Sequence, residues 1–183
     1  MDIERELRDL VARREILKAI HAYMRGQDRL DPALQISAFH ADADVDCGLL
    51  RGGPQAYTDF AQGLLSQMKA SQHLVGQVDL SIDIEAGTAS GEVYFLAWHR
   101  VEGGSALGEA GDLLMAGRYI DDYALKDGKW AIQRRRELID WARQDPATDA
   151  ILHEQTMIHL SGRKGKDFSQ TRDWTSGISG REQ

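Results

Sequence analysis

The sequence contains a single cysteine, Cys47, and no long apolar run. Each of these features excludes a class of protein. One cysteine excludes a disulfide within the chain and is typical of the reducing cytoplasm. No stretch approaches the roughly 20 consecutive apolar residues that are needed to cross a bilayer. The first residues, MDIERELRDL, are charged from the second position and lack the apolar segment of a signal peptide. We therefore expect a cytoplasmic protein with no membrane partner.

Positive charge is also scarce. The 22 Lys and Arg residues against 29 Asp and Glu residues give a net charge of -7, which makes nucleic acid a poor partner. The chain of 183 residues is 42% apolar and is long enough to bury a core. We expect one folded domain over residues 1–145. Residues 146–183 are expected to form a C-terminal extension that is partly helical and then either mobile or folded onto a partner.

The motifs of nucleotide and metal sites are missing. There is no G-x-x-x-x-G-K-[ST], no G-x-G-x-x-G after a strand and no H-E-x-x-H. His153 and His159 lie six residues apart, which puts them on different helical faces. The segment DADVDCG begins like a calcium loop, but Cys47 and Gly53 occupy the positions of the required glycine and glutamate. We predict neither a metal site nor a bound cofactor.

Apolar residues recur at helical spacing in three segments of the first third of the chain. Residues 2–25 form the longest amphipathic pattern, and Gly26 is expected to end this helix in the left-handed conformation. Asp31 is placed to cap a second, short helix that has Pro32 in its first turn. A third helix is predicted over residues 54–69.

The period then changes to the alternation that is typical of strands. Residues 73–83 and 89–101 alternate on either side of an EAGT turn, and the glycine-rich loop EGGSALGEAGD follows. Residues 113–126 and 130–141 form the strongest hairpin, because the Asp-Gly between them suits a tight turn. Three helices followed by long antiparallel strands indicate an α+β fold. We expect a cone-shaped, curved, mixed antiparallel sheet that wraps around the three helices and encloses an apolar pocket.

Three consecutive arginines lie inside the last predicted strand. Alternation sends Arg134 and Arg136 to one face and Arg135 to the other. Trp130 and Ile132 share the face of Arg136, so parity favours Arg136 as the inward residue, although a bulge would reverse the choice. An inward arginine needs an anionic partner, whereas one that extends to the end of the strand does not.

Two histidines are expected near one end of the first strand pair. If the strands pair around EAGT, opposite residues have numbers that add up to about 172 or 173, and those of His73 and His99 add up to 172. Each alone is more typical of a structural, hydrogen-bonded histidine. Together with Asp28, at the end of the first helix, they suggest an Asp–His pair in which the carboxylate fixes the tautomer of a proton-accepting imidazole.

Five segments carry a resemblance to a known family. They are RREILKAIHAYMRGQDRLD, GPQAYTDF, QHLVGQVDLSID, FLAWHR and AGRYIDDYALKDGKWAIQRRRELIDW. Over about residues 5–142 the chain resembles the SnoaL-like branch of the nuclear-transport-factor-2-like superfamily. That branch includes scytalone dehydratase, bile-acid dehydratase, a lindane dehydrochlorinase, steroid isomerases and polyketide cyclases. The last segment is the most specific, but it identifies the family better than it identifies a reaction.

The resemblance implies a set of catalytic residues. In dehydratase-like members a helix-end aspartate meets a pocket histidine, and some have a tyrosine five residues before the aspartate. Asp28, His73 and Tyr23 match these positions. The family often has an arginine after W-x-I, for which Arg135 and Arg136 compete, and a second polar pocket residue. The predicted catalytic set is Tyr23, Asp28, His73, His99 and Arg136.

The chemistry that this set implies needs no cofactor. His73, oriented by Asp28, would remove a proton next to a carbonyl or an aromatic ring. Tyr23 or Arg136 would hold the oxyanion, and His99 would protonate a leaving hydroxyl. We expect a lyase that eliminates water, or releases a fragment by a retro-aldol reaction. The alternatives are an isomerase or cyclase, and a non-catalytic ligand-binding module.

The expected substrate is small, hydrophobic and ring-bearing. Aromatic and apolar residues should form its pocket, although not all of them can face inwards. A homotrimer is expected, with a homodimer as the alternative, because apolar residues on the convex side of the sheet need cover. The predicted substrate contacts are Tyr57, Phe60, Leu64, Phe95, Trp98, Arg118 and Arg135.

Overall fold

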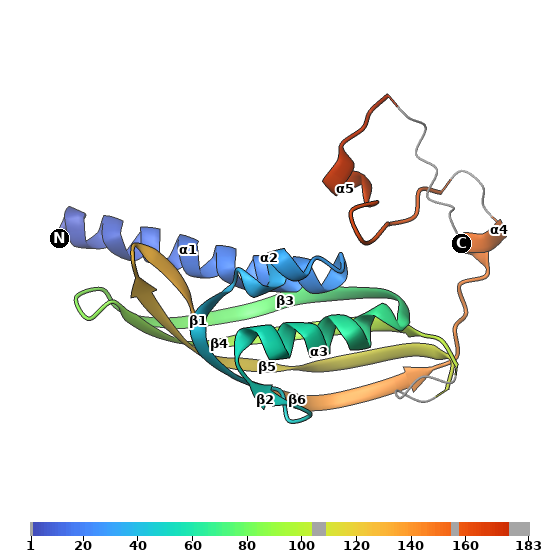
Figure 1. Ribbon diagram of the computed structural model, residues 1–183, viewed down its shortest axis with the longest axis horizontal. Helices are drawn as coiled ribbons and strands as arrows, with labels where there is room; N and C mark the ends of the chain where they lie inside the picture. The colour runs from blue at the N-terminus through green and yellow to red at the C-terminus, as the bar shows by residue number, and fades with distance from the viewer. Residues whose placement is uncertain (1, 104–108, 155–157, 176–183) are drawn as a thin grey trace.

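The computed structural model describes residues 2–103, 109–154 and 158–175. In this part of the chain, three helices lie along one face of a six-stranded sheet, and the C-terminal extension rises beside the end of the first helix (Figure 1). The helices are α1 (Ile3–Asp28), α2 (Pro32–Ile36) and α3 (Pro54–Ser66), with α4 (Ile151–Glu154) and α5 (Phe168–Thr171) in the extension. The strands are β1 (Phe39–Asp46), β2 (Arg51–Gly52), β3 (Met68–Asp83), β4 (Thr88–Val101), β5 (Gly111–Lys126) and β6 (Lys129–Asp145). Residues 104–108 of the predicted glycine-rich loop lie outside the described residues.

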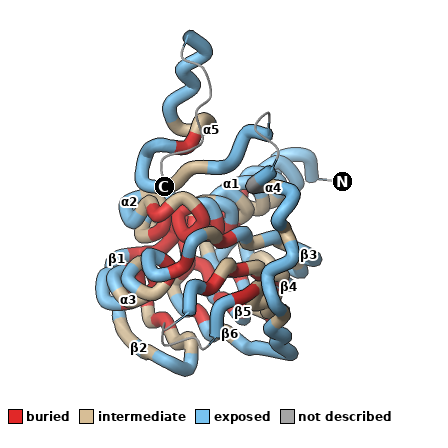
Figure 2. The backbone as a smooth tube through the Cα atoms, turned by 90° about the vertical axis from the view of Figure 1, so that its right-hand side faces the viewer, coloured by how far each residue is buried: buried red, intermediate tan, exposed pale blue. Residues whose placement is uncertain are grey.

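The sheet has the order β2-β1-β6-β5-β4-β3 and stays open, with β2 and β3 at its edges. Neighbouring strands are antiparallel except β1 and β6, which run parallel. Buried residues gather between the helices and the inner face of the sheet, whereas the outer surface is exposed (Figure 2). The predicted α+β fold, a curved mixed sheet around N-terminal helices, is confirmed.

The end of α1 differs from the prediction. Gly26 lies inside the helix, which continues to Asp28, and the positive φ falls on Leu30 at 50°. A Cβ on Gly26 would lie 2.5 Å from the backbone nitrogen of Gln35 in α2. The glycine is therefore required by the close approach of α2 and not by the end of the helix.

The start of α2 follows the prediction. The side chain of Asp31 accepts a hydrogen bond from the backbone N–H of Leu34 at 3.0 Å, and Pro32 lies in the first turn. The cap turns the chain back against α1 immediately after Asp28. Because α2 then packs on Gly26, the carboxylate of Asp28 is held at one place above the sheet.

The hairpin of β5 and β6 also follows the prediction. Asp127 and Gly128 both have positive φ, at 51° and 76°, as a two-residue hairpin turn with the right twist requires. The two strands then pair from Lys126–Lys129 to Asp112–Asp145. This long pair forms the centre of the sheet.

The C-terminal extension returns to the end of α1. The guanidinium of Arg163 donates hydrogen bonds to the backbone oxygens of Leu65 and Met68, at 3.1 and 2.8 Å. It also donates to the backbone oxygen of Asp28 and to the hydroxyl of Ser71. One side chain thus joins the ends of α1 and α3 to the start of β3. The division into residues 1–145 and 146–183 stays a prediction.

Among the described residues, no helix is both long enough and apolar enough to cross a membrane.

Replacing Gly26 tests the contact between α1 and α2. We expect Gly26→Ala to lower the free energy of unfolding by about 1–3 kcal/mol, because the methyl group would collide with the backbone of Gln35. Urea unfolding measures the change. Gly63→Ala is the matched control, since Gly63 is an exposed residue of α3 whose Cβ would meet no atom within 4 Å. That variant should be as stable as the wild type or slightly more so. Equal losses in both variants would contradict this account.

Candidate active site

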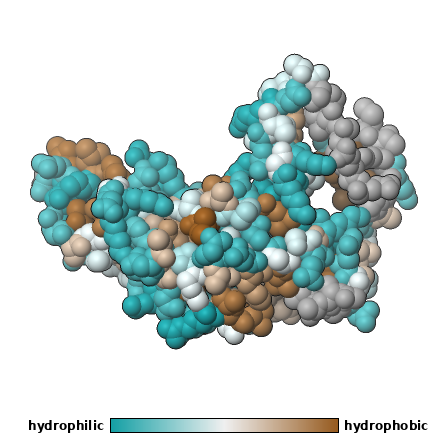
Figure 3. Space-filling model, in the orientation of Figure 1, coloured by the Kyte–Doolittle hydropathy of each residue, from teal (hydrophilic) through white to brown (hydrophobic). Residues whose placement is uncertain are grey.

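A cavity of about 390 Å³ lies between α3 and the inner face of the sheet. A space of this size accommodates a small organic molecule. Leu49, in the β1–β2 turn, and Ile139, in β6, line the cavity but are partly exposed, so they mark its rim. Figure 3 shows apolar surface by the β1–β2 turn, below α3. Four predicted substrate contacts line the cavity: Tyr57, Phe60, Leu64 and Phe95.

Two other predicted substrate contacts, Trp98 and Arg118, lie on the outer face of the sheet, so the prediction is wrong for them. Alternation along β4 and β5 turns the odd-numbered residues inwards and these two outwards. The guanidinium of Arg118 forms ion pairs with Glu92 and Asp140, at 2.7 and 3.0 Å. The ring of Trp98 lies under the guanidinium of Arg100, 5.5 Å from its centroid.

The carboxylate of Asp28 is hydrogen-bonded to both the backbone and the ring of His73. It accepts from the backbone N–H at 3.0 and 3.1 Å and is 2.7 Å from Nδ1. Both side chains are nearly buried, and His73 lines the cavity while Asp28 lies behind it. A carboxylate at Nδ1 selects the tautomer with the proton there and leaves the lone pair on Nε2. The pair therefore has the arrangement of a general base.

His99 also lines the cavity, and its ring meets that of His73 edge-on at 5.2 Å between centroids. The predicted register is wrong by two residues, because His73 pairs with Ala97. One residue of this error arises at the turn, where Asp83 pairs with Thr88, and the other arises from a bulge in β3 between Val75 and Val78. The two histidines still share a face. Burial, reinforced by the charge of His73, lowers the pKa of His99 to about 4. His99 is therefore a neutral imidazole at pH 7.

Tyr23 lies behind the wall of the cavity and not on its surface. It is fully buried, and its hydroxyl is hydrogen-bonded to that of Tyr57. Gln27 donates to the Tyr23 hydroxyl at 3.0 Å. Both Tyr57 and Gln27 line the cavity. Burial raises the pKa of Tyr23 to about 12, although the Arg135 charge opposes this, so Tyr23 stays protonated. Tyr23 can thus act on a ligand only through Tyr57 and Gln27.

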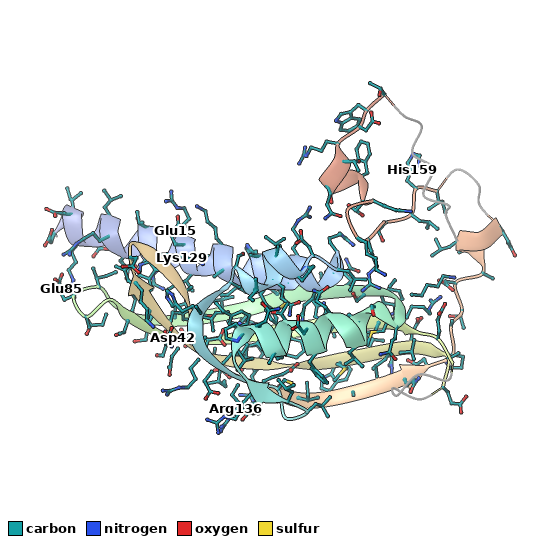
Figure 4. All side chains as sticks on the ribbon, in the orientation of Figure 1. Glu15, Asp42, Glu85, Lys129, Arg136 and His159 are labelled. Carbon is teal, nitrogen blue, oxygen red and sulfur yellow. The ribbon has the colours of Figure 1, made fainter. Side chains whose placement is uncertain are left out.

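The inward arginine is Arg135, so parity predicted the wrong residue. Arg136 is exposed, points away from the sheet (Figure 4) and pairs with Asp46 at 3.2 Å. The pairing of β6 with β5 shifts by one residue beside Gln133. Because of this bulge, the inward side chains change from the even-numbered Ile132 to the odd-numbered Arg135.

Arg135 forms its contacts within the buried core. It is 1% exposed and donates through Nε and a terminal nitrogen to Asp121, at 2.7 and 2.6 Å. Its guanidinium also lies over the rings of Tyr23 and Tyr119, at 4.3 and 4.1 Å from their centroids. Arg135 does not reach the surface of the cavity, so the prediction that it contacts substrate is wrong.

The sequence reasoning missed Glu137 and Gln27, which both line the cavity. Glu137 lies opposite Tyr119 on the inner face. Among the described residues, no hydrogen bond or ion pair involves its carboxyl group. Burial raises the pKa of Glu137, and the charges of Arg135 and His73 oppose this in part. Once the bulge turns Arg135 inwards, alternation turns Glu137 inwards too, which is the signal that could have found it.

Residues 8–136 match the family model of the SnoaL-like domain. This segment includes most of α1, all of α2, α3 and β1 to β5, and the first half of β6, which is more than half of the chain. The chain belongs to the SnoaL-like domain family. The predicted relation to the SnoaL-like branch is therefore confirmed.

Solved structures share the SnoaL-like fold at low sequence identity. A type-2 LinA hexachlorocyclohexane dehydrochlorinase is 19% identical, with a TM-score of 0.69 over 78% of this chain and 95% of its own. A proposed scytalone dehydratase from Novosphingobium aromaticivorans is 21% identical, with a TM-score of 0.66 over 77% and 92%. LinA type 3 from Novosphingobium barchaimii is 17% identical, with a TM-score of 0.67 over 85% and 97%. No curated protein sequence matches the chain. Identities this low establish the fold and leave the reaction open.

The described part of the SnoaL-like chain contains no group of three or more His, Cys, Asp or Glu side chains that could hold a metal ion. The side chain of His153 lies outside the described residues.

Removing Asp121 tests the buried ion pair. We expect Asp121→Ala to lower the free energy of unfolding by about 3–5 kcal/mol, because it leaves the buried charge of Arg135 without a partner. Asp122→Ala is the matched control, since Asp122 pairs with Arg134 at the surface, and it should cost at most about 1 kcal/mol. Urea unfolding of both variants measures the difference. A loss below 1 kcal/mol for Asp121→Ala would contradict the structural role of the pair.

Burial of His99 predicts a pH dependence of stability. Its pKa falls from 6.5 to about 4 on folding, so the unfolded chain binds the proton more tightly. The stabilisation is complete above about pH 6.5 and is lost as the pH falls towards 4, by about 3 kcal/mol in total. Urea unfolding between these pH values should show a steeper loss for the wild type than for His99→Gln. Parallel curves would rule out a buried, neutral His99.

Proposed function

We propose that the protein is a cofactor-independent lyase that acts on a small, hydrophobic, ring-bearing molecule. The observation that supports this proposal is the contact between Asp28 and His73 at the wall of an apolar cavity. A cavity that only bound an apolar ligand would gain nothing from an ionisable pair in its wall, because desolvation of charge is costly. The presence of Asp28 and His73 at this wall is explained if the pair transfers a proton.

The proposed reaction begins at Nε2 of His73. This atom takes a proton from a carbon next to a carbonyl or an aromatic ring, and Asp28 stabilises the imidazolium that forms. Negative charge develops on the substrate oxygen. Tyr57 lines the cavity, and its hydroxyl is hydrogen-bonded to that of Tyr23, which also accepts from Gln27. In the proposed reaction this hydroxyl donates a hydrogen bond to the substrate oxygen. The electron pair then expels hydroxide from the next carbon, and the hydroxide takes up a proton and leaves as water. In the retro-aldol alternative, His73 would instead take the proton of a β-hydroxyl group, and the bond between the α- and β-carbons would break to release a small carbonyl fragment.

The names of the structural neighbours support elimination. One is called a dehydrochlorinase and another a proposed scytalone dehydratase, and both names describe the removal of a small molecule from a ring compound. The apolar wall of Phe60, Leu64 and Phe95 suits a flat ring. A double-bond isomerase is the second candidate, because the same cavity contains a carboxyl group, Glu137, and a tyrosine, Tyr57.

We also propose that the protein works in the cytoplasm as a homo-oligomer, a trimer in preference to a dimer. The outer face of the sheet exposes apolar side chains that a second copy would cover. The large exposed residues on this face include Leu74, Tyr94, Ile120 and Trp141.

The base is tested by removing each partner. We expect Asp28→Asn and His73→Ala to lower turnover by about 10²–10⁴-fold, because proton abstraction loses its base or its tautomer. Ligand affinity should change by less than about tenfold, since neither change removes one of the apolar side chains of the wall. The assay uses a panel of hydroxylated cyclic ketones and halogenated cyclohexanes, with products identified by mass spectrometry.

Two controls match these substitutions. Asp59→Asn changes an exposed residue of α3, and His159→Ala an exposed residue far from the sheet (Figure 4). Both should keep full activity. Full activity in either variant of the pair would refute the proposed base. A product lighter by one water, or by one hydrogen halide from a halogenated substrate, indicates elimination, and two carbonyl fragments indicate a retro-aldol reaction. A product of unchanged mass indicates the isomerase, and ligand binding without any product indicates a binding module.

A further inference from the structure

We propose that Glu137 is a second catalytic residue, whose carboxylic acid gives its proton to the leaving group in the elimination that His73 begins. This inference rests on the proposed function. It assigns a role to a side chain of the cavity that neither the fold nor the proposed base requires.

Glu137 is an acidic residue of the cavity wall that has no partner among the described residues. Asp28 is hydrogen-bonded to His73, and Asp121 is paired with Arg135. Glu137 lines the cavity, yet in the described part of the chain its carboxyl group forms no hydrogen bond and no ion pair. An unpaired carboxyl group in an apolar wall is costly unless a ligand satisfies it. Its orientation is thus explained by a substrate group that accepts a hydrogen bond.

The reaction itself demands an acid. His73 removes one proton from carbon, the carbon–oxygen bond breaks, and the leaving hydroxide must take up one proton to depart as water. His99 is a poor donor at neutral pH, because burial lowers its pKa to about 4. Tyr57 is also a poor donor, because burial raises the pKa of its phenol well above the ordinary value. Burial raises the pKa of Glu137, which increases its protonated fraction towards neutral pH.

Burial favours the neutral form of the Glu137 carboxyl, and the charged groups around it oppose this in part. Arg135 on the same strand, which is itself paired with Asp121, and the protonated form of His73 on β3 favour its ionised form. The other titratable groups near it are uncharged at pH 7. They are the phenols of Tyr23, Tyr57 and Tyr119 and the thiol of Cys47.

The catalytic cycle balances. The substrate loses a proton to His73 and gains one from Glu137, so water leaves and a double bond forms. The enzyme is left with an imidazolium and a carboxylate. After the product departs, His73 releases a proton to solvent and Glu137 takes one up. No oxidant, reductant or further reactant is needed.

An acid of this kind matters only for a poor leaving group, and this dependence gives the test. The full chain is assayed on two matched cyclic ketones that carry, at the β-carbon, either a hydroxyl or a chloride. We expect Glu137→Gln to lower turnover of the hydroxyl compound by about 10²–10⁴-fold. Turnover of the chloride compound should change by less than about tenfold, because chloride departs without a proton. Glu85→Gln, at the far end of the molecule (Figure 4), is the matched control and should leave both rates unchanged.

The pH profile provides a second readout. With the hydroxyl compound, the wild-type rate should fall as the pH rises through the raised pKa of Glu137, since the acid loses its proton. This fall should be absent with the chloride compound. Folding does not confuse the result, because glutamine mimics the neutral carboxyl and the variant should unfold at a urea concentration no lower than the wild type.

The two proposals fail in different ways. Equal losses on both compounds, or no loss on either, would overturn the role of Glu137 while the proposed base still stands. If His73→Ala kept full activity on both compounds, the proposed base itself would be wrong. The assignment of Glu137 as the acid is supported if Glu137→Gln lowers turnover of the hydroxyl compound alone, and if the fall in rate at higher pH is absent with the chloride compound.

Discussion

The hydrogen bonds between Asp28 and His73 are the interaction on which the rest of the site depends. One carboxylate accepts from both the backbone and the ring of His73, so it ties the edge strand of the sheet to the end of α1. Because α2 packs on Gly26, the end of α1 cannot shift relative to the second helix. The position of the imidazole is therefore set by contacts on three elements, which is the pre-organisation that proton transfer requires.

The interior contains two groups of polar residues, one that stabilises the fold and one that faces the cavity. Behind the wall, Arg135 is paired with Asp121 and stacked on Tyr23, while its other terminal nitrogen has no hydrogen-bond partner among the described residues. In front of the wall, His73 and Glu137 meet the cavity from strands at opposite sides of β4 and β5. The buried arginine contributes to the site through its field, because it favours ionised groups nearby without contacting a ligand.

Helix caps and turns could be predicted from the sequence, whereas the side of the sheet to which each strand residue points could not. The cap at Asp31 and the turn at Asp127 depend on neighbouring residues, so short motifs predicted both. The bulge beside Gln133 leaves no such motif, and it decides which arginine faces inwards. One missed bulge therefore placed Arg136 in the pocket and concealed Glu137. The errors at β4 and β5 have another cause, because large aromatic or cationic residues also cover the outer face of an open sheet.

Arg163 has a consequence for how the functional unit is defined. The family model ends at residue 136, yet this arginine, from well beyond that boundary, joins the ends of two helices to the strand that carries His73. Homologous domains can therefore share the helices and the sheet while differing in what joins the ends of α1 and α3 to β3. A chimera that exchanged only the matched segment between relatives would contain the cavity without the contacts of Arg163. The extension and the matched segment should therefore be transferred together.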